Sequence, residues 1–382
     1  MNEIESLFHE VIEYNKGIDI KDIILDKSYL LDVHNNNVYN NIIIQYYERL
    51  RDEFTSHVGV TKSSLISNVT IESIKKCNKF FAINRYDCNM IKDFISTNLC
   101  HSKFCNNCKK VKQASRMSRY IPELKPYKDT LYHVIFTLPN VSGSDLKFTL
   151  KNKMSNAFRK LMRYINGTKK LSFIDFSKYG YLGAIRSLEI TFKDDNYHPH
   201  YHCAFAFKNL VMEKNITNVY SFDFKGNKDI RYFSEFEIIL QKLWYMCLND
   251  ITVNKENYDN LELGFSVACN KFQDDDYAEL FKYMTKETDE INNVLTYDNF
   301  KTLYFSSLFL KQIQGYGIFY RIDDSGIDNE VDIYYNDILY YLSQDEKPIL
   351  QLERPFDLLN DNNYTIISRK KIYQCLRELD KK

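Results

Sequence analysis

Three histidines within one short run, HPHYH, are the strongest chemical signal in this sequence: His198, His200 and His202. On a β-strand, residues two apart point to the same face, so His200 and His202 would present two imidazoles side by side. Neighbouring imidazoles are good ligands for a divalent transition metal. Tyr201 would point to the opposite face and pack in the core. His198 precedes Pro199 at the edge of a loop, and it is either a third ligand or only a neighbour of the pair.

Two imidazoles do not complete a metal site, and a carboxylate from a neighbouring strand is the natural addition. Glu189 lies in the apolar run GAIRSLEITF, which the polar segment KDDNYHP joins to the histidines. Such a connection predicts a β-hairpin, which would place Glu189 on the strand beside the histidines. A metal held there with open coordination positions can bind a phosphate oxygen and polarise a scissile bond.

A second chemically useful pair, Glu279 and Tyr283, lies ~80 residues after the histidines. The segment DDDYAELFKYMTKETDE predicts a helix over about residues 274–286, on which this pair shares a face. Lys282 and Lys286 form another pair with the same spacing. A tyrosine hydroxyl can attack a phosphodiester when a metal polarises the bond and nearby charge favours the phenolate. A carboxylate one turn away can act as a general base toward water.

Several cysteines have the close spacing of zinc knuckles, C-x4-C-x2-C, and thiolates at this spacing can chelate one ion. They are Cys100, Cys105 and Cys108. A structural zinc prefers four ligands, and we choose Cys77 as the fourth, with Cys88 and His101 as alternatives. The first residues, MNEIESLFHEVIEYNKG, are acidic and lack a long apolar run, so we expect no signal peptide. Reduced thiols, some of them on metal, are therefore favoured over disulfides.

A sheet with helices around it must position these side chains. Apolar and β-branched runs predict strands over residues 132–138, 183–192 and 200–207. Helices are expected over about residues 146–165, 234–248 and 274–286, and through much of the first 70 residues. Neighbouring antiparallel strands mixed with helices predict an α+β fold.

The length of 382 residues and the hydrophobic content of 44% are sufficient for two or three structural units. We divide the chain into a helical N-terminal segment without an assigned role, a cysteine-rich basic region, a catalytic domain and an acidic C-terminal segment. Their boundaries are residues 1–70, 71–125, 126–322 and 323–382. No run of about 18 apolar residues occurs, so we expect no membrane span.

The formal net charge is zero, but the charges are unevenly distributed along the chain. Between His101 and Lys170 there are 16 basic and 3 acidic residues, whereas between Arg321 and Asp361 there are 3 basic and 11 acidic residues. The basic block is suited to neutralising phosphates of DNA with release of counterions. The alternative is a solvated surface that the acidic end of the chain balances.

Taken in order along the chain, these motifs resemble the HUH-type replication initiators of small rolling-circle plasmids. Cys77 and the run CHSKFCNNCKK resemble the cysteine region of that family, and HVIFTLPN resembles its first motif. GAIRSLEITFKDDNYHPHYH resembles its metal motif, and AELFKYMTKETD resembles its nicking motif. A short downstream segment, GYGIFY, is also similar. The resemblance covers about residues 75–320.

The resemblance implies an HUH fold, in which an antiparallel sheet bears the histidine pair and helices surround it. It implies Mg²⁺ or Mn²⁺ as the working metal, with His200 and His202 as ligands. Tyr283 would be the nucleophile that forms a 5′-phosphotyrosyl intermediate and leaves a free 3′-OH. Glu279 would activate water to end the cycle. The lysines at positions 282 and 286 would steady the phosphate.

The same resemblance implies a cytoplasmic protein whose partner is plasmid origin DNA, nicked in single-stranded form, with host helicase and polymerase as further candidates. Two alternatives stay open. One is another HUH enzyme, a transposase or a relaxase, although a mobilisation relaxase usually carries its tyrosine ahead of the histidines. The other is a non-enzymatic, zinc-stabilised DNA-binding regulator, which would leave the HPHYH run unused.

Overall fold

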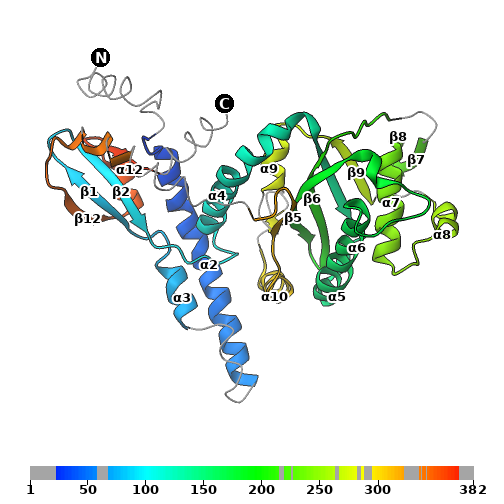
Figure 1. Cartoon of the computed structure of the whole chain (residues 1–382). Helices are drawn as coiled ribbons and strands as arrows, with labels where there is room; N and C mark the ends of the chain where they lie inside the picture. Colours follow the sequence, from blue (N-terminus) through cyan, green and yellow to red (C-terminus); the bar gives the residue numbers. More distant parts are fainter. Residues whose placement is uncertain are drawn as a thin grey trace. The chain divides into compact units, whose positions relative to one another are not determined.

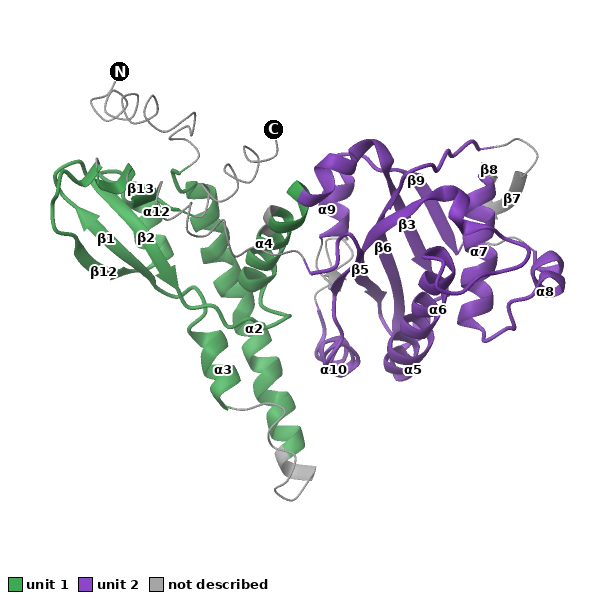
Figure 2. Ribbon diagram, viewed as in Figure 1, with its two compact units in different colours: residues 1–122, 323–382 green, residues 123–322 purple. Residues whose placement is uncertain are grey.

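The chain forms two compact units in the computed structural model, and Figure 2 colours them separately. Unit 1 contains residues 1–122 and 323–382, and unit 2 contains residues 123–322. The structure describes residues 23–57, 68–214, 219–224, 227–262, 266–281, 285–287, 295–321, 335–336, 338–340 and 342–369. None of the helices in these ranges is both long enough and apolar enough to cross a bilayer.

Unit 1 consists of helices packed on a small sheet (Figure 1). Its helices are α2 (Lys27–His57), α3 (Asn68–Lys75), α4 (Asn106–Leu124) and α12 (Pro355–Asn360). Its strands are β1 (Phe81–Tyr86), β2 (Ile91–Thr97), β12 (Ile349–Glu353) and β13 (Thr365–Ile367). The strand order is β12-β1-β2-β13, with β13 parallel to β2 and the other pairs antiparallel. The start of the long helix α2 is capped by Asp26, whose carboxylate accepts a hydrogen bond from the Ser28 amide at 2.8 Å.

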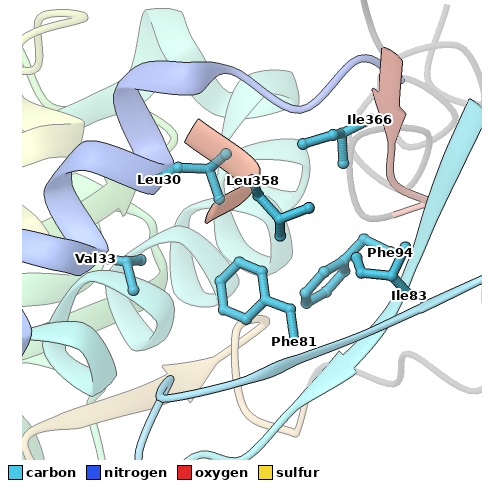
Figure 3. Close-up of a cluster of buried hydrophobic side chains, with 7 residues drawn as sticks. All are labelled: Leu30, Val33, Phe81, Ile83, Phe94, Leu358 and Ile366. Carbon is cyan, nitrogen blue, oxygen red and sulfur yellow. The ribbon is translucent and has the colours of Figure 1, made fainter. Parts of the chain in front are cut away.

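The core of unit 1 is built from both ends of the chain, as Figure 3 shows. Its buried side chains are Leu30, Val33, Phe81, Ile83, Phe94, Leu358 and Ile366. Leu358 and Ile366 come from the acidic C-terminal segment, so this segment completes a core that α2, β1 and β2 begin. Unit 1 therefore joins residues that we assigned to three separate segments.

A buried lysine forms ion pairs with two carboxylates of the acidic C-terminal segment. Lys92 on β2 has a side chain that is only 7% exposed. Its Nζ lies 2.8 Å from the Glu353 carboxylate and 2.6 Å from the Asp361 carboxylate. These two ion pairs link β2 to the end of β12 and to the residue after α12.

Unit 2 contains a larger mixed sheet with the order β10-β5-β6-β3-β9, in which β11 also pairs with β5 and β4 with β6. Its strands are β3 (Leu131–Thr137), β4 (Val141–Ser142), β5 (Tyr181–Lys193), β6 (Asn196–Phe207), β9 (Val267–Lys271), β10 (Thr285–Glu287) and β11 (Ile313–Gly317). A separate ribbon pairs β7 (Val219–Phe224) with β8 (Asn227–Tyr232). Its helices are α5 (Gly143–Phe148), α6 (Ser155–Ile165), α7 (Glu235–Leu248), α8 (Lys255–Asn260), α9 (Asp276–Leu280) and α10 (Tyr297–Ser306). This arrangement confirms the α+β class.

Shorter helical stretches complete unit 2. They are a π-helical stretch, Thr149–Met154, and two 3-10 helices, Lys125–Thr130 and Phe176–Tyr179. The π-helical stretch joins α5 to α6, so the helix that we expected over residues 146–165 is present as these three consecutive pieces.

Strands β5 and β6 form the hairpin that the sequence predicts, with Glu189 directly opposite His200. The turn is shorter than expected, because β6 already begins at Asn196. His198 therefore pairs with Thr191 inside the ladder and does not lie at a loop edge. Asn299 of α10 supports this tight turn, since its Nδ2 donates to the Asp194 carbonyl at 2.7 Å.

The two faces of the β6 strand have different roles. Tyr201 is buried on the face that α6 and α7 cover, as predicted for the residue between the two histidines (Figure 1). Its ring centroid lies 5.2 Å from that of Phe158 on α6 and 6.4 Å from that of Trp244 on α7. His200 and His202 alternate with Tyr201, so they lie on the opposite face of the sheet.

The helix predicted over about residues 274–286 is wrong in its extent. Helix α9 ends at Leu280, and residues 285–287 form β10, which pairs in parallel with β5. Lys286 lies opposite Thr191 in this ladder. Pairing with an exposed edge of β5 is a tertiary interaction, and it overrides the local helical preference of the segment. Lys286 therefore lies on a strand and not on the predicted helix.

Candidate active site

Glu189, His200 and His202 bring three potential metal ligands together on one face of the unit 2 sheet. The Oε2 atom of Glu189 lies 2.9 Å from Nε2 of His200 and 2.9 Å from Nε2 of His202. All three side chains are buried or nearly so. The hairpin register produces this geometry, because it places Glu189 beside the histidine strand with its side chain on the histidine face.

The donor set fits a divalent metal. Two imidazole nitrogens and one carboxylate oxygen lie within 4.8 Å of one another, and such a set leaves coordination positions open for a substrate. Burial would raise the pKa of Glu189, but hydrogen bonds and charge from His200 and His202 outweigh it and hold this pKa below its usual value. The carboxyl group is therefore ionised, as a metal ligand must be.

The tautomer of His200 is set by the backbone. Its Nδ1 lies 3.1 Å from the carbonyl oxygen of His198, which can only accept a hydrogen bond. Nδ1 therefore carries a proton, so Nε2 is the nitrogen whose lone pair would bind a metal held between it and Glu189. His198 contributes this carbonyl. Its imidazole is outside the group of mutually close donor atoms found among the described residues.

His202 is held by two residues to which the sequence analysis assigned no role, His133 and Asp276. Nδ1 of His202 lies 3.1 Å from Nε2 of His133, and Nδ1 of His133 lies 2.7 Å from Oδ1 of Asp276. An ionised carboxylate only accepts, so His133 donates to Asp276 and accepts a hydrogen bond from Nδ1–H of His202. Nε2 of His202 is then the atom available to a metal. His133 and Asp276 fix the tautomer of His202, as supporting residues do for the histidine ligands of many metal sites.

His133 is buried on β3, next to β6, and Asp276 begins α9. Burial lowers the pKa of His133, while the charges of Asp276 and Glu279 act in the opposite direction. Glu279 follows Asp276 by one helical turn and so shares its face of α9. This helix therefore carries both the support of His202 and the proposed water-activating carboxylate.

The remaining residues of the predicted nicking motif are only partly described. Tyr283 and Lys282 lie outside the described residues. The backbone of Lys286 is described in β10, but its side chain is not. The described structure thus brings the metal ligands and the α9 carboxylates into one unit, while the nucleophile remains a prediction.

In unit 1, the four cysteines that we chose as zinc ligands lie together. Sγ of Cys77 lies 3.6 Å from that of Cys105 and 3.5 Å from that of Cys108, and Sγ of Cys100 lies 3.6 Å from that of Cys108. Tetrahedral zinc with Zn–S bonds of about 2.3 Å requires sulfur atoms about 3.8 Å apart, so the spacing fits.

The alternatives for the fourth ligand lie elsewhere. Cys88 is exposed and its thiol donates to the Ser343 carbonyl at 3.2 Å, and His101 is not among the clustered donors of the described chain. A hydrogen bond from Cys100 lowers the pKa of Cys105 and of Cys108, whereas hydrogen bonds within the cluster raise the pKa of Cys77 and of Cys100. Two of the four thiols therefore favour the thiolate form, and the other two would lose their protons when zinc replaces these hydrogen bonds. Asn40 of α2 donates to Sγ of Cys105 at 3.3 Å and ties the cluster to the long helix.

The chain is similar in sequence to known replication proteins. A family model described as replication protein matches residues 92–220, which include three of the four clustered cysteines and the whole Glu–His–His cluster. Protein rep of Bacillus amyloliquefaciens is 24% identical over 288 residues, which cover 72% of this chain and 76% of that protein. No solved structure matches the chain. The two sequence matches confirm the resemblance to the Rep family of plasmid replication initiators and support a role in the initiation of plasmid replication.

Proposed function

We propose that this chain is a metal-dependent HUH endonuclease that nicks one strand of a plasmid origin and starts rolling-circle replication. The observation that carries the proposal is the Glu189–His200–His202 cluster, in which one carboxylate oxygen lies 2.9 Å from a ring nitrogen of each imidazole. A mixed sheet with the histidines on one face and packed helices on the other is compatible with an HUH fold.

Glu189, His200 and His202 would hold the catalytic ion. When bound, this ion would polarise the scissile phosphodiester and offset its negative charge. The resemblance implies Mg²⁺ or Mn²⁺. Mg²⁺ prefers oxygen ligands in octahedral geometry, whereas two imidazoles suit a transition metal better, so we favour Mn²⁺. The four cysteines would hold a structural zinc, whose closed thiolate site leaves no position for a substrate.

The protein side chains would carry the covalent chemistry. The phenol of Tyr283 loses its proton and its oxygen attacks the phosphorus, while the bond from phosphorus to the 3′ oxygen breaks. The products are a 5′-phosphotyrosyl bond and a 3′ oxygen that takes up a proton. Glu279 later takes a proton from water, and the resulting hydroxide releases the tyrosine. Lys282 and Lys286 would steady the phosphate through their positive charge.

The domain assignment and the partners are part of the same proposal. Residues 126–322 would form the nickase domain, and residues 71–125 the zinc-binding basic region. The N-terminal and C-terminal segments have no assigned role. Origin DNA would be the substrate in the cytoplasm, and host helicase and polymerase would follow the nick.

The test is incubation of the purified chain with Mn²⁺ and a supercoiled plasmid that carries its origin. We expect nicked circles with covalently attached protein. Tyr283→Phe should abolish attachment, and Glu279→Ala should still nick but release product more slowly. Tyr320→Phe is the matched control, because it removes the same atom from an exposed tyrosine of unit 2.

Other outcomes would overturn the proposal. Covalent attachment by the Tyr283→Phe protein would show that another residue is the nucleophile. DNA that is shifted in a gel but never cut would support the zinc-stabilised DNA-binding regulator. Attachment that persists in EDTA would contradict metal dependence.

A further inference from the structure

A cavity of unit 2, of about 650 Å³, lies on the sheet face opposite to the histidines. Arg186, Leu188 and Tyr201 line it from β5 and β6. On each strand these residues alternate with Glu189 or the histidines, so their side chains point to the other face. Helix α6, strand β11 and the segment just after α10 complete the walls. The cavity is therefore separate from the proposed metal site.

The lining of this cavity is strongly basic. It contains five cationic side chains and no carboxylate. The cations are Lys151, Arg159, Arg163, Arg186 and Lys311. Elsewhere in unit 2 comparable lysines are neutralised, as Lys160 is by Asp250 at 2.5 Å and Lys178 by Glu235 at 3.1 Å. Within the described part of the chain, none of the five cavity cations forms an ion pair. Such a concentration of one sign of charge attracts an anion.

Arg186 is the buried base of the cavity, with only 7% of its surface exposed. Its guanidinium lies 4.4 Å from the ring centroid of Tyr201 and 5.5 Å from that of Phe158. One terminal nitrogen donates to the Lys311 carbonyl at 3.3 Å, whereas Nε has no hydrogen-bond partner. A buried cation with an unused donor is costly unless an anion completes its hydrogen bonds.

An exposed aromatic ring stands at the same cavity. Phe309 is 89% exposed, and Nζ of Lys151 lies 5.9 Å from its ring centroid. Its backbone has a φ of 62°, in the left-handed region that is unfavourable for a bulky side chain. An apolar ring held in solvent by strained backbone, beside a basic cavity, has the form of a stacking platform for a nucleic-acid base.

We propose that this cavity binds single-stranded nucleic acid, with a backbone phosphate on Arg186 and its neighbouring cations and a base stacked on Phe309. The shared chemistry is a nucleotide phosphate, and the choice of a polynucleotide over a free nucleotide rests on the proposed function. The site would hold part of the strand away from the Glu–His–His cluster, on the other face of the sheet. Phosphate contacts would supply affinity, and stacking would tolerate any base.

The test measures binding of the full chain to a fluorescein-labelled thymidine oligonucleotide of about 16 nucleotides, in buffer without added Mn²⁺ or Mg²⁺ and over a range of salt concentrations. Phe309→Ala should raise the Kd about tenfold, because one stacked base is lost. Arg163→Ser should lower the slope of log affinity against log salt by about 0.7, the effect of one phosphate contact on a single strand. Lys160→Ser is the matched control on α6, since its side chain pairs with Asp250 outside this cavity.

The results for the two variants test the cavity separately from the nicking activity. An unchanged salt slope and Kd in both variants would overturn the proposal even if the protein nicks DNA. A lowered slope would support it even if no nicking occurs, because the assay contains no Mn²⁺ or Mg²⁺ for the metal step. Thymidine monophosphate that competes as strongly as the oligonucleotide would make the cavity a free-nucleotide site and overturn the polynucleotide assignment. Absence of any oligonucleotide binding would also overturn it.

Discussion

The four-cysteine cluster of unit 1 and the Glu–His–His cluster of unit 2 are both suited to metal, but they differ in ligand type and number. The first offers four soft thiolates, which satisfy a tetrahedral zinc and leave no position for a substrate. The second offers two imidazoles and one carboxylate, which leave positions open. Ligand type and number therefore suit the first cluster to stabilising a fold and the second to binding a substrate.

The surroundings of the two clusters differ in the same way. The cysteines are supported by the packing of their own region, with Leu99 against them and Asn40 donating to one sulfur. The histidines are supported by a chain of titratable side chains, His202, His133 and Asp276, that leads to helix α9. A structural site needs only rigid placement, whereas a reactive site also needs each donor atom in the correct protonation state.

The largest expected effect follows removal of a cysteine ligand. Zinc binding at such a site contributes on the order of 10 kcal/mol to folding. Cys105→Ser should therefore lose zinc and leave unit 1 largely unfolded, while unit 2 stays folded. Trp244 is the one tryptophan of the chain and lies in α7, so its fluorescence reports on unit 2. Circular dichroism and zinc content report the loss in unit 1.

The matched control for this prediction is Cys88→Ser, because Cys88 is exposed and lies outside the cluster. It should retain zinc and unfold like the parent protein. If zinc content and helicity are unchanged in Cys105→Ser, the cysteine cluster does not hold a zinc that stabilises unit 1. The distinction between a structural and a reactive site would then be lost.

A smaller effect is expected when the support of His202 is weakened. Asp276→Asn replaces an obligatory acceptor by a group that can present a donor to His133, so the tautomer of His202 is no longer fixed. Mn²⁺ affinity, measured by titration calorimetry, should fall about 10–100-fold. The Mn²⁺ concentration needed for half-maximal nicking should rise in parallel, and Asp276→Glu should restore part of the affinity.

Asp275→Asn is the control, since it removes the same charge from the adjacent exposed residue. If both variants lower Mn²⁺ affinity equally, general electrostatics explains the effect, and Asp276 is not a positioning residue. If Asp276→Asn alone loses affinity while Trp244 fluorescence is unchanged, the chain from Asp276 to His202 is confirmed.

Local patterns in the sequence were sufficient for the ligands and insufficient for their support. The alternation along HPHYH and the hairpin pattern predicted that Glu189 lies with His200 and His202. The requirement for four zinc ligands called for a fourth donor, for which we chose Cys77 over Cys88 and His101. His133 was missed because it stands alone in its strand, and only the pairing of β3 with β6 brings it to His202. A histidine within the mostly apolar run YHVIFTL was the available signal.

Long-range strand pairing explains the other differences. β12 pairs with β1, which lies more than two hundred residues earlier, so the acidic C-terminal segment did not reveal that it belongs to unit 1. Similarly, α9 ends at Leu280 because the residues of β10 pair with β5. The α+β class needed only local patterns, whereas these pairings depend on strand order, which no local pattern encodes.

The smallest expected effect concerns the stability of unit 2, to which the four-cysteine cluster does not belong. Glu237 on α7 is fully buried and accepts hydrogen bonds from the Ser234 amide at 2.9 Å and the Cys269 amide at 3.0 Å. Glu237→Gln keeps the shape but places an NH₂ group against one of these amides, which should cost about 2 kcal/mol. Urea unfolding followed by Trp244 fluorescence measures this loss of stability. The control is Glu235→Gln, at an exposed residue of the same helix turn, which should change the free energy of unfolding by less than about 0.5 kcal/mol. Because Glu237 caps α7 and ties it to β9, its loss should weaken unit 2 and leave the zinc content of unit 1 unchanged. If Glu237→Gln also loses zinc, the stability of unit 1 depends on that of unit 2, and the two units are not stabilised independently.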